Sequence, residues 1–141
     1  LRDAPVWIHA EDADMLTRPE RNLSVLVGAD VRTGPADGFL EHGTVIGFGP
    51  GPGLTVIHTP GHTAGGVCFN AGAFVLAGDT LFRGSIGRSD FPGSSEALLL
   101  QSIRSGLMVL QDGVRVYPGH GEPTDIGFER RHNPFLSGRP G

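Results

Sequence analysis

The sequence predicts a mixed α/β sandwich. Several short runs of β-branched and other apolar residues are joined by turns rich in glycine and proline, which is typical of antiparallel strands. A strand–loop–helix–strand unit follows in the second half, so the fold combines both kinds of element. The sequence contains neither the glycine fingerprint of dinucleotide-binding folds nor a phosphate-binding Gly-Lys-Ser/Thr loop, which argues against a doubly wound sheet.

The first third of the chain predicts short elements separated by polar connections. Residues 6–9 form a short β-rich run, in which Trp7 is expected to lie in the core. Residues 11–16 are predicted to form a short helix, because acidic residues lie near its positive N-terminal end. Residues 17–37 are mostly polar and are expected to form a loop or covering segment, and residues 44–48 are predicted to form a strand.

Three further strands are predicted in the middle of the chain. The Gly-Pro-Gly-Pro-Gly sequence at residues 49–53 cannot continue a strand ladder and therefore marks a turn. Strands are expected over residues 54–58, 67–69 and 74–77. The last two are expected to form a hairpin that turns at residues 71–72.

The longest helix is predicted over residues 95–110. Leu100, Ile103, Leu107 and Leu110 recur there at helical spacing, and Ser94 or Ser95 can cap the first turn. The remaining predicted elements are a loop over 81–93, a strand over 114–117 and a short helix over 127–132 that ends before Pro134.

Composition limits the classes of partner. The net charge of -4 gives no electrostatic case for binding nucleic acid or an anionic membrane surface. No apolar stretch approaches the ~20 residues that a transmembrane helix needs. Cys68 is the single cysteine and lies in an apolar run, so it is expected in the core and cannot form a disulfide within the chain. A reducing compartment, and therefore the cytoplasm, is the expected location.

Three residues with metal-binding side chains each follow a predicted strand. His62 and His120 each end a Pro-Gly-His sequence, and Asp79 follows the strand that lies between them in sequence. Strand ends can converge on one edge of a sheet, where two imidazoles and a carboxylate suit zinc, iron or manganese. The spacing is too wide for a zinc finger, and no thiolate accompanies these residues. Two alternatives stay open: Asp79 can form a hydrogen-bonded turn with the backbone near Leu81, and the histidines can be structural.

Five segments together resemble the second part of the metallo-β-lactamase-fold hydrolases, in their short glyoxalase-II-like branch. They occur in family order at residues 58–63, 77–82, 83–93, 117–121 and 133–136. The resemblance implies an α/β fold of the αββα sandwich type, incomplete at its N-terminal side. It assigns residues 1–136 to a partial domain of this type and leaves residues 137–141 as a frayed C-terminal tail.

The resemblance also implies roles for the three residues. His62 would bind the first metal, Asp79 would bridge both metals, and His120 would bind the second. The family implies two zinc ions in a complete site, with iron or manganese as alternatives, and attack of a metal-bound hydroxide on the carbonyl of a substrate. The expected substrate is a small-molecule thioester such as a hydroxyacylglutathione, with neither nucleic acid nor membrane as a partner.

One family segment, His-x-His-x-Asp-His, does not occur in this sequence. In the family it supplies the remaining ligands of both metals. We therefore expect the chain to begin just after that segment of a longer protein, and the isolated chain to bind metal weakly and to have little activity. Two alternatives remain: a mononuclear iron enzyme similar to persulfide dioxygenases, which residues 83–91 resemble, and a catalytically dead fragment or interaction module.

Other residues have two interpretations. Arg88 can bind a substrate carboxylate or form a salt bridge with Asp90. His58 and Tyr117 precede the two Pro-Gly-His segments and are interpreted as core groups or as groups that orient the ligands. Residues 129–132 are expected to form a solvated helix face.

Overall fold

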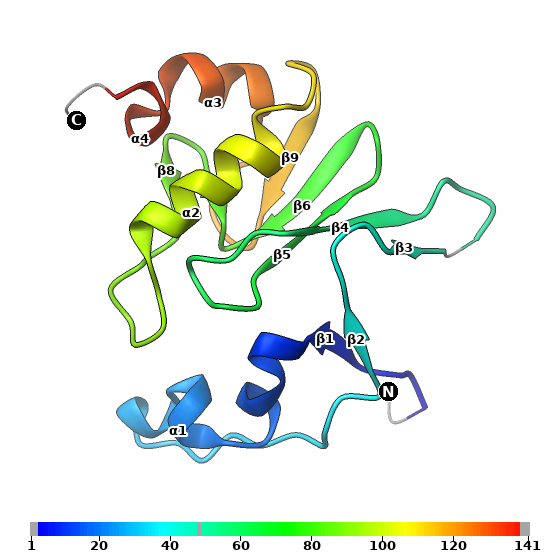
Figure 1. The fold of residues 1–141 in the computed structure, drawn as a ribbon, viewed down its shortest axis with the longest axis vertical. Coiled ribbons are helices and arrows are strands. Elements are labelled where there is room, and N and C mark those ends of the chain that lie inside the picture. Colours follow the sequence, from blue (N-terminus) through cyan, green and yellow to red (C-terminus); the bar gives the residue numbers. More distant parts are fainter. Residues whose placement is uncertain (1–2, 48, 139–141) are drawn as a thin grey trace. The chain divides into compact units, whose positions relative to one another are not determined.

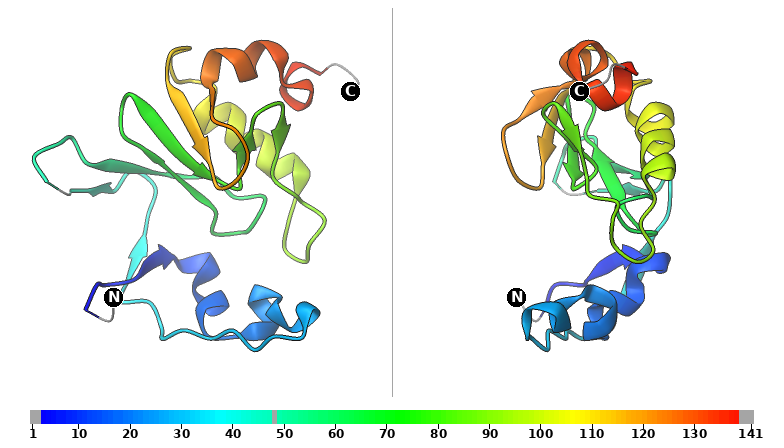
Figure 2. Two further views of the ribbon diagram at one scale, coloured as in Figure 1. Left: turned by 180° about the vertical axis from the view of Figure 1, so that it is seen from behind. Right: turned by 90° about the vertical axis from the view of Figure 1, so that its left-hand side faces the viewer.

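The computed structural model describes residues 3–47 and 49–138, and the chain divides into two compact units between Leu40 and Glu41 (Figures 1 and 2). Each unit is described by itself. The mixed α/β character predicted from the sequence is confirmed. Among the described residues, no helix is both long and apolar enough to cross a lipid bilayer. The assignment of residues 1–136 to one domain remains a prediction.

The first unit is built on a small parallel pair of strands. Strand β1 (Trp7–His9) pairs with β2 (Gly38–Leu40), with Trp7 opposite Gly38. The 3-10 helix η1 (Ala10–Leu16) follows β1 directly and replaces the helix predicted over residues 11–16. The imidazole Nδ1 of His9 accepts a hydrogen bond from the Glu11 backbone amide at 3.2 Å and so caps this helix.

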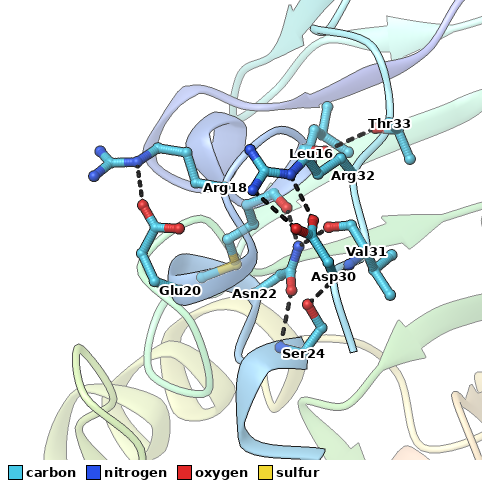
Figure 3. A network of polar contacts seen from close by, with 10 residues as sticks. Leu16, Arg18, Glu20, Asn22, Ser24, Asp30, Val31, Arg32 and Thr33 are labelled. Atoms are coloured by element: carbon cyan, nitrogen blue, oxygen red, sulfur yellow. Dashed lines mark hydrogen bonds and ion pairs between the residues drawn. The ribbon is translucent and has the colours of Figure 1, made fainter. Parts of the chain in front are cut away.

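The polar segment 17–37, predicted to be a loop or covering segment, contains two short helices that were not predicted. It contains α1 (Pro19–Asn22) and the 3-10 helix η2 (Ser24–Val27). The Asn22 side chain donates hydrogen bonds to the carbonyl oxygens of Met15 and Val31, at 2.8 and 2.9 Å (Figure 3). Such side-chain bonds to the backbone stabilise short turns that have few apolar residues to bury.

Trp7 is not a core residue, contrary to the prediction. It is 51% exposed. Its ring lies against Gly38, where an added Cβ would come within 3.0 Å of the indole. Because the sheet has only two strands, an aromatic side chain on one face is covered by little else.

The second unit contains a six-stranded sheet with the strand order β10-β9-β6-β5-β4-β3. Its strands are β3 (Val45–Ile46), β4 (Leu54–His58), β5 (Val67–Asn70), β6 (Phe74–Gly78), β9 (Arg115–Pro118) and β10 (Thr124–Asp125). Successive strands from β3 to β6 pair antiparallel, whereas β6 pairs in parallel with β9. The strands predicted over residues 54–58, 67–69, 74–77 and 114–117 are confirmed, and Phe48 of the predicted strand 44–48 lies outside the described residues.

Helices lie in the connection between β6 and β9 and again after β10. The predicted long helix is α2 (Glu96–Ser102), which continues into a π-helical turn η3 (Ile103–Leu107). Ser95 caps it by accepting a hydrogen bond from the Leu98 amide at 3.2 Å, as predicted. Two more helices, α3 (Ile126–His132) and α4 (Pro134–Ser137), end the described chain (Figure 1).

The core of the second unit lies between its helices and its sheet. Leu99, Ile103 and Leu107 are fully buried in a cluster that also contains Val75 and Val116. Gly106 permits the close approach, because a Cβ there would lie 2.9 Å from a methyl group of Ile57 on β4. The predicted loop over residues 81–93 is partly ordered as a small hairpin of β7 (Leu81–Phe82) and β8 (Ser85–Ile86).

Candidate metal centre

Strand directions bring three potential ligands to one edge of the sheet. Strands β6 and β9 are parallel, and β4 also runs in their direction because two antiparallel pairings separate it from β6. His62, Asp79 and His120 follow the C-terminal ends of these three strands, so all three emerge at the same edge. This is the convergence that the sequence predicts.

The carboxylate of Asp79 lies between the two imidazoles. Its Oδ1 is 3.2 Å from Nδ1 of His120, and its Oδ2 is 3.7 Å from Nε2 of His62. The His120 side chain is the most exposed of the three, at 73%, and the His62 side chain the least, at 25%. The arrangement is therefore open to solvent on the His120 side.

One hydrogen bond shows that Nδ1 of His62 carries a proton. Its Nδ1 lies 2.8 Å from the backbone carbonyl oxygen of Arg88. A carbonyl oxygen only accepts hydrogen bonds, so Nδ1 carries the proton and donates it. In the neutral ring, Nε2 therefore has a free electron pair, and this nitrogen faces Asp79. A backbone carbonyl that orients a ligating imidazole in this way is common at metal sites.

Glycines allow the backbone to approach Asp79 closely. At Gly119, an added Cβ would lie 2.6 Å from the Asp79 Oδ1 atom, and at Gly87 it would lie 1.8 Å from the Asp79 carbonyl oxygen. Gly61 has a φ of +144° and contacts the backbone of Leu99, where a Cβ would come within 2.4 Å. The glycines of the two Pro-Gly-His segments are thus required by the packing around the strand ends.

The separations between these side chains are compatible with metal binding, and the alternatives of a turn at Asp79 and of structural histidines remain predictions. Two ligands about 2.1 Å from a tetrahedral zinc ion are separated by about 3.4 Å. The observed separations of 3.2 and 3.7 Å lie on either side of this value. Two nitrogen donors and a carboxylate therefore fit metal binding on both sides of Asp79.

The ligand set around each position is nevertheless small. Among residues 3–47 and 49–138, no group of three or more His, Cys, Asp and Glu side chains is placed to hold one ion. The described residues thus offer each ion one imidazole and a share of the Asp79 carboxylate, whereas catalytic zinc normally has three protein ligands.

The hairpin β7–β8 completes the surroundings. The ring of Phe82 lies 4.5 Å from the imidazole of His120, centre to centre. A cavity of about 270 Å³ is lined by both histidines, Asp79, Phe82, Ser85, Ile86 and Arg88. A neighbouring cavity of about 320 Å³ extends from His120 toward Arg83 and Glu122. Sequence reasoning missed Phe82 and Ser85, although both lie in a segment that resembles the family.

The Arg88 guanidinium forms the salt bridge that was one of its two predicted interpretations. It donates hydrogen bonds to both carboxylate oxygens of Asp90, at 3.0 and 2.9 Å, and its charged group lies 4.2 Å from the centre of the Phe91 ring. These hydrogen bonds hold the pKa of Asp90 below its ordinary value. A role of the side chain in substrate binding remains a prediction.

His58 contacts a site loop, whereas Tyr117 is exposed and is therefore not a core residue. Nε2 of His58 is 3.0 Å from the carbonyl oxygen of Ala64, so this ring contacts the loop that carries His62. The Tyr117 ring packs edge-on against Phe74, with ring centres 5.7 Å apart. A ligand-orienting role of either residue remains a prediction.

Cys68 is buried, as predicted, and lies 3.4 Å from the Thr59 hydroxyl. Burial raises the pKa of its thiol, so the thiol is a poor nucleophile at neutral pH. Glu129 contradicts the prediction of a solvated face for residues 129–132, because it is fully buried whereas the other three are exposed. The i, i+4 spacing of Glu129 and Asn133 is the sequence signal for this inward face.

Comparison with known proteins decides the family. A sequence profile described as the metallo-beta-lactamase superfamily matches residues 1–120. The chain belongs to this superfamily. Both the family and the fold class inferred from the sequence are confirmed, and the superfamily makes a metal-dependent hydrolase the class of enzyme to which the chain is related.

Several named members of the superfamily are similar to the chain. An uncharacterized protein of Mycobacterium leprae is 46% identical, over 95% of this chain and 65% of its own length. A probable metallo-hydrolase of Bacillus subtilis, YqgX, is 37% identical over 96% of this chain and 65% of its own. The hydroxyacylglutathione hydrolase GloC of Haemophilus influenzae is 39% identical over 72% of this chain and 48% of its own.

Solved structures give the same fold. BLEG-1 B3 metallo-beta-lactamase superposes with a TM-score of 0.87 at 38% identity, covering 94% of this chain and 65% of the other. TTHA1623 in a di-iron-bound form has a TM-score of 0.81 at 38% identity, over 95% and 66%. ETHE1 from Myxococcus xanthus has a TM-score of 0.70 at 34% identity, over 74% and 48%. The chain thus spans about two thirds of the length of several relatives.

Proposed function

We propose that the protein hydrolyses thioesters in the manner of glyoxalase II, at a metal site to which His62, Asp79 and His120 contribute. The observation that carries the proposal is the placement of the Asp79 carboxylate between two imidazole nitrogens at one edge of the sheet. The similarity to the hydroxyacylglutathione hydrolase GloC supports a thioester of a small thiol as substrate.

The residues of the chain supply orientation and shape. His62 keeps Nε2 free for a ligand bond because its Nδ1 donates to Arg88. Asp79 provides one carboxylate oxygen on each side, and the ring of Phe82 and the side chain of Ile86 form apolar walls near it. Bound metal ions would lower the pKa of water and stabilise negative charge on a carbonyl oxygen. Zinc is the proposed metal, and iron is supported by the similarity to the di-iron form of TTHA1623.

A mononuclear iron dioxygenase acting on persulfides is the second candidate. It rests on the segment 83–91 and on the similarity to ETHE1. His120 favours the hydrolase, because a second histidine on the far side of Asp79 suits a second metal ion better than a single one. The count of bound metal ions therefore separates the two candidates.

The test measures metal content and two activities. Purified protein is analysed for zinc, iron and manganese, then assayed for hydrolysis of S-lactoylglutathione and for oxygen uptake with glutathione persulfide. The chain is assayed alone and mixed with a fragment that carries the His-x-His-x-Asp-His segment of a relative. We expect thioester hydrolysis when ligands are complete, and its loss in Asp79→Asn but not in the control His132→Gln on α3.

Oxygen uptake with one iron per chain would replace the hydrolase by the dioxygenase. Absence of bound metal and of both activities, even with the added fragment, would contradict the proposal and favour an interaction module.

A further inference from the structure

Glu129 is a buried carboxylate outside the metal centre. It lies on α3 and is fully buried. The hydroxyl of Thr124 donates to its Oε1 at 2.6 Å, and the Asn133 amide donates to its Oε2 at 2.7 Å. The backbone amide of Gly84 donates to both oxygens, at 3.2 and 3.0 Å. Burying a carboxylate is costly unless it is hydrogen-bonded, and here three neutral donors satisfy it.

The partners of Glu129 connect α3 to the turn of the β7–β8 hairpin. Gly84 lies in this turn, and the Asn133 amide that bonds Glu129 also donates to the carbonyl oxygen of Ser85 at 3.1 Å. On the other side of Gly84, the Arg83 guanidinium lies 4.1 Å from the centre of the Phe128 ring, again on α3. The turn is therefore held to the helix at three successive residues.

The hairpin in turn holds the ring of His120. Phe82 directly precedes the turn formed by residues 83–84, and it pairs with Ser85 across the hairpin. Its ring packs against the His120 imidazole at 4.5 Å, and Nδ1 of His120 lies 3.2 Å from the carboxylate of Asp79. Because His120 is 73% exposed, these two contacts account for much of its orientation.

We propose that Glu129 is a positioning residue for the metal centre, which acts through Gly84 and Phe82 to keep the His120 imidazole in place. The inference rests on the proposed function, because positioning His120 serves a metal site only if His120 binds metal. The contacts between Glu129, the hairpin and His120 do not depend on that function. An apolar side chain at position 129 could not accept the hydrogen bonds by which Glu129 holds the hairpin turn.

The hydrogen-bond geometry predicts different results for two substitutions. In Glu129→Gln, the amide nitrogen can occupy the Oε1 position, because the Thr124 hydroxyl can rotate and accept. The amide oxygen then still accepts from Gly84 and Asn133. In Glu129→Met, only a weakly accepting thioether sulfur remains, so Thr124 and Gly84 lose their carboxylate partner and Asn133 keeps only its bond to Ser85. We therefore expect the Gln variant to retain the position of the hairpin and the Met variant to lose it.

The experiment combines two metal-free measurements with one metal titration of the same protein. Amide hydrogen exchange at Gly84 and the imidazole NMR signals of His120 are measured without metal, and zinc affinity is then measured by competition with a chelator. Asp125→Ala serves as the matched control, because it removes the cap of the same helix but leaves Glu129 and its partners unchanged. Phe82→Leu covers the case in which Glu129→Met does not fold.

Expected results are faster Gly84 exchange, shifted or broadened His120 ring signals and about tenfold weaker zinc binding in Glu129→Met. Phe82→Leu should reproduce the ring and zinc effects with Gly84 exchange unchanged, while Glu129→Gln and Asp125→Ala stay near wild type. Unchanged His120 signals in folded Glu129→Met, or equal changes in Asp125→Ala, would overturn the inference. Failure of wild-type protein to bind zinc would instead count against the proposed function, because the metal-free measurements still decide the role of Glu129.

Discussion

Gly119→Ala should weaken metal binding while leaving the fold largely intact. A Cβ at this position would lie 2.6 Å from Oδ1 of Asp79, whereas ordinary contact begins at 3.4 Å. The Cβ also comes within 3.2 Å of the Gly78 carbonyl carbon, so the backbone of residue 119 cannot easily shift away from Asp79. The Asp79 carboxylate must therefore move by about 0.8 Å to relieve the clash. The 3.2 Å separation of Asp79 from His120 would lengthen toward about 4 Å, too long for both to bind one ion.

We expect zinc affinity to fall about 10- to 100-fold, as when groups that support metal ligands are removed, and the free energy of unfolding to fall by about 1–3 kcal/mol. Affinity is measured by chelator competition and stability by urea denaturation. Gly113→Ala is the control, because its Cβ would enter open space, and it should change stability by no more than about 0.5 kcal/mol. Equal zinc affinity in the two variants would refute the argument that Gly119 is required for the position of Asp79.

Three further outcomes are expected. Ile103→Ala should lower the free energy of unfolding, measured by urea denaturation, by about 2–5 kcal/mol, because Ile103 is fully buried. The exposed control Val109→Ala should lower it by about 0.5 kcal/mol or less. Equal losses would contradict the placement of Ile103 in the core. The Cys68 thiol should react with a disulfide reagent only after unfolding, and rapid labelling of the native protein would contradict its burial. Because burial raises the pKa of this thiol, the free energy of unfolding should decline as pH rises above the pKa of the unfolded thiol, and it should decline less in Cys68→Ser. Because Arg88 lowers the pKa of Asp90, the pair should stabilise the fold by a small amount at pH values above the unfolded-state pKa of the aspartate. This stabilisation should be lost as pH falls through the folded-state pKa of Asp90. Thermal melts of wild type and Asp90→Asn that change identically with pH would contradict this.

The strands were predictable because their signals are local. Residues 54–58 are rich in β-branched side chains and lie between the Gly-Pro turn at 49–53 and a Thr-Pro-Gly sequence, and the structure has β4 over the same residues. The hairpin through residues 71–72 was predictable for the same reason. The convergence of His62, Asp79 and His120 followed from strand direction, which the order of elements largely determines.

The elements that the sequence did not predict depend on distant partners. The β7–β8 hairpin has only two residues in each strand and is held by Glu129 and Asn133, about 45 residues away in sequence. Glu129 itself belongs to a charged run. Its i, i+4 spacing to Asn133 is the one sequence signal of its inward side chain, and its contact with Gly84 follows only from the fold. Trp7 resembles a core residue in sequence, but the two-stranded sheet that carries it buries little of it.

Arg88 illustrates how one position can serve two purposes independently. Its main-chain carbonyl orients His62, while its side chain points to Asp90 and Phe91. Every amino acid has a backbone carbonyl, so the residue at position 88 can change while its carbonyl still accepts the hydrogen bond from the His62 imidazole. The side chain at this point of the cavity wall can therefore change by single substitutions, in evolution or in a directed library, while the hydrogen bond that orients the His62 imidazole is kept.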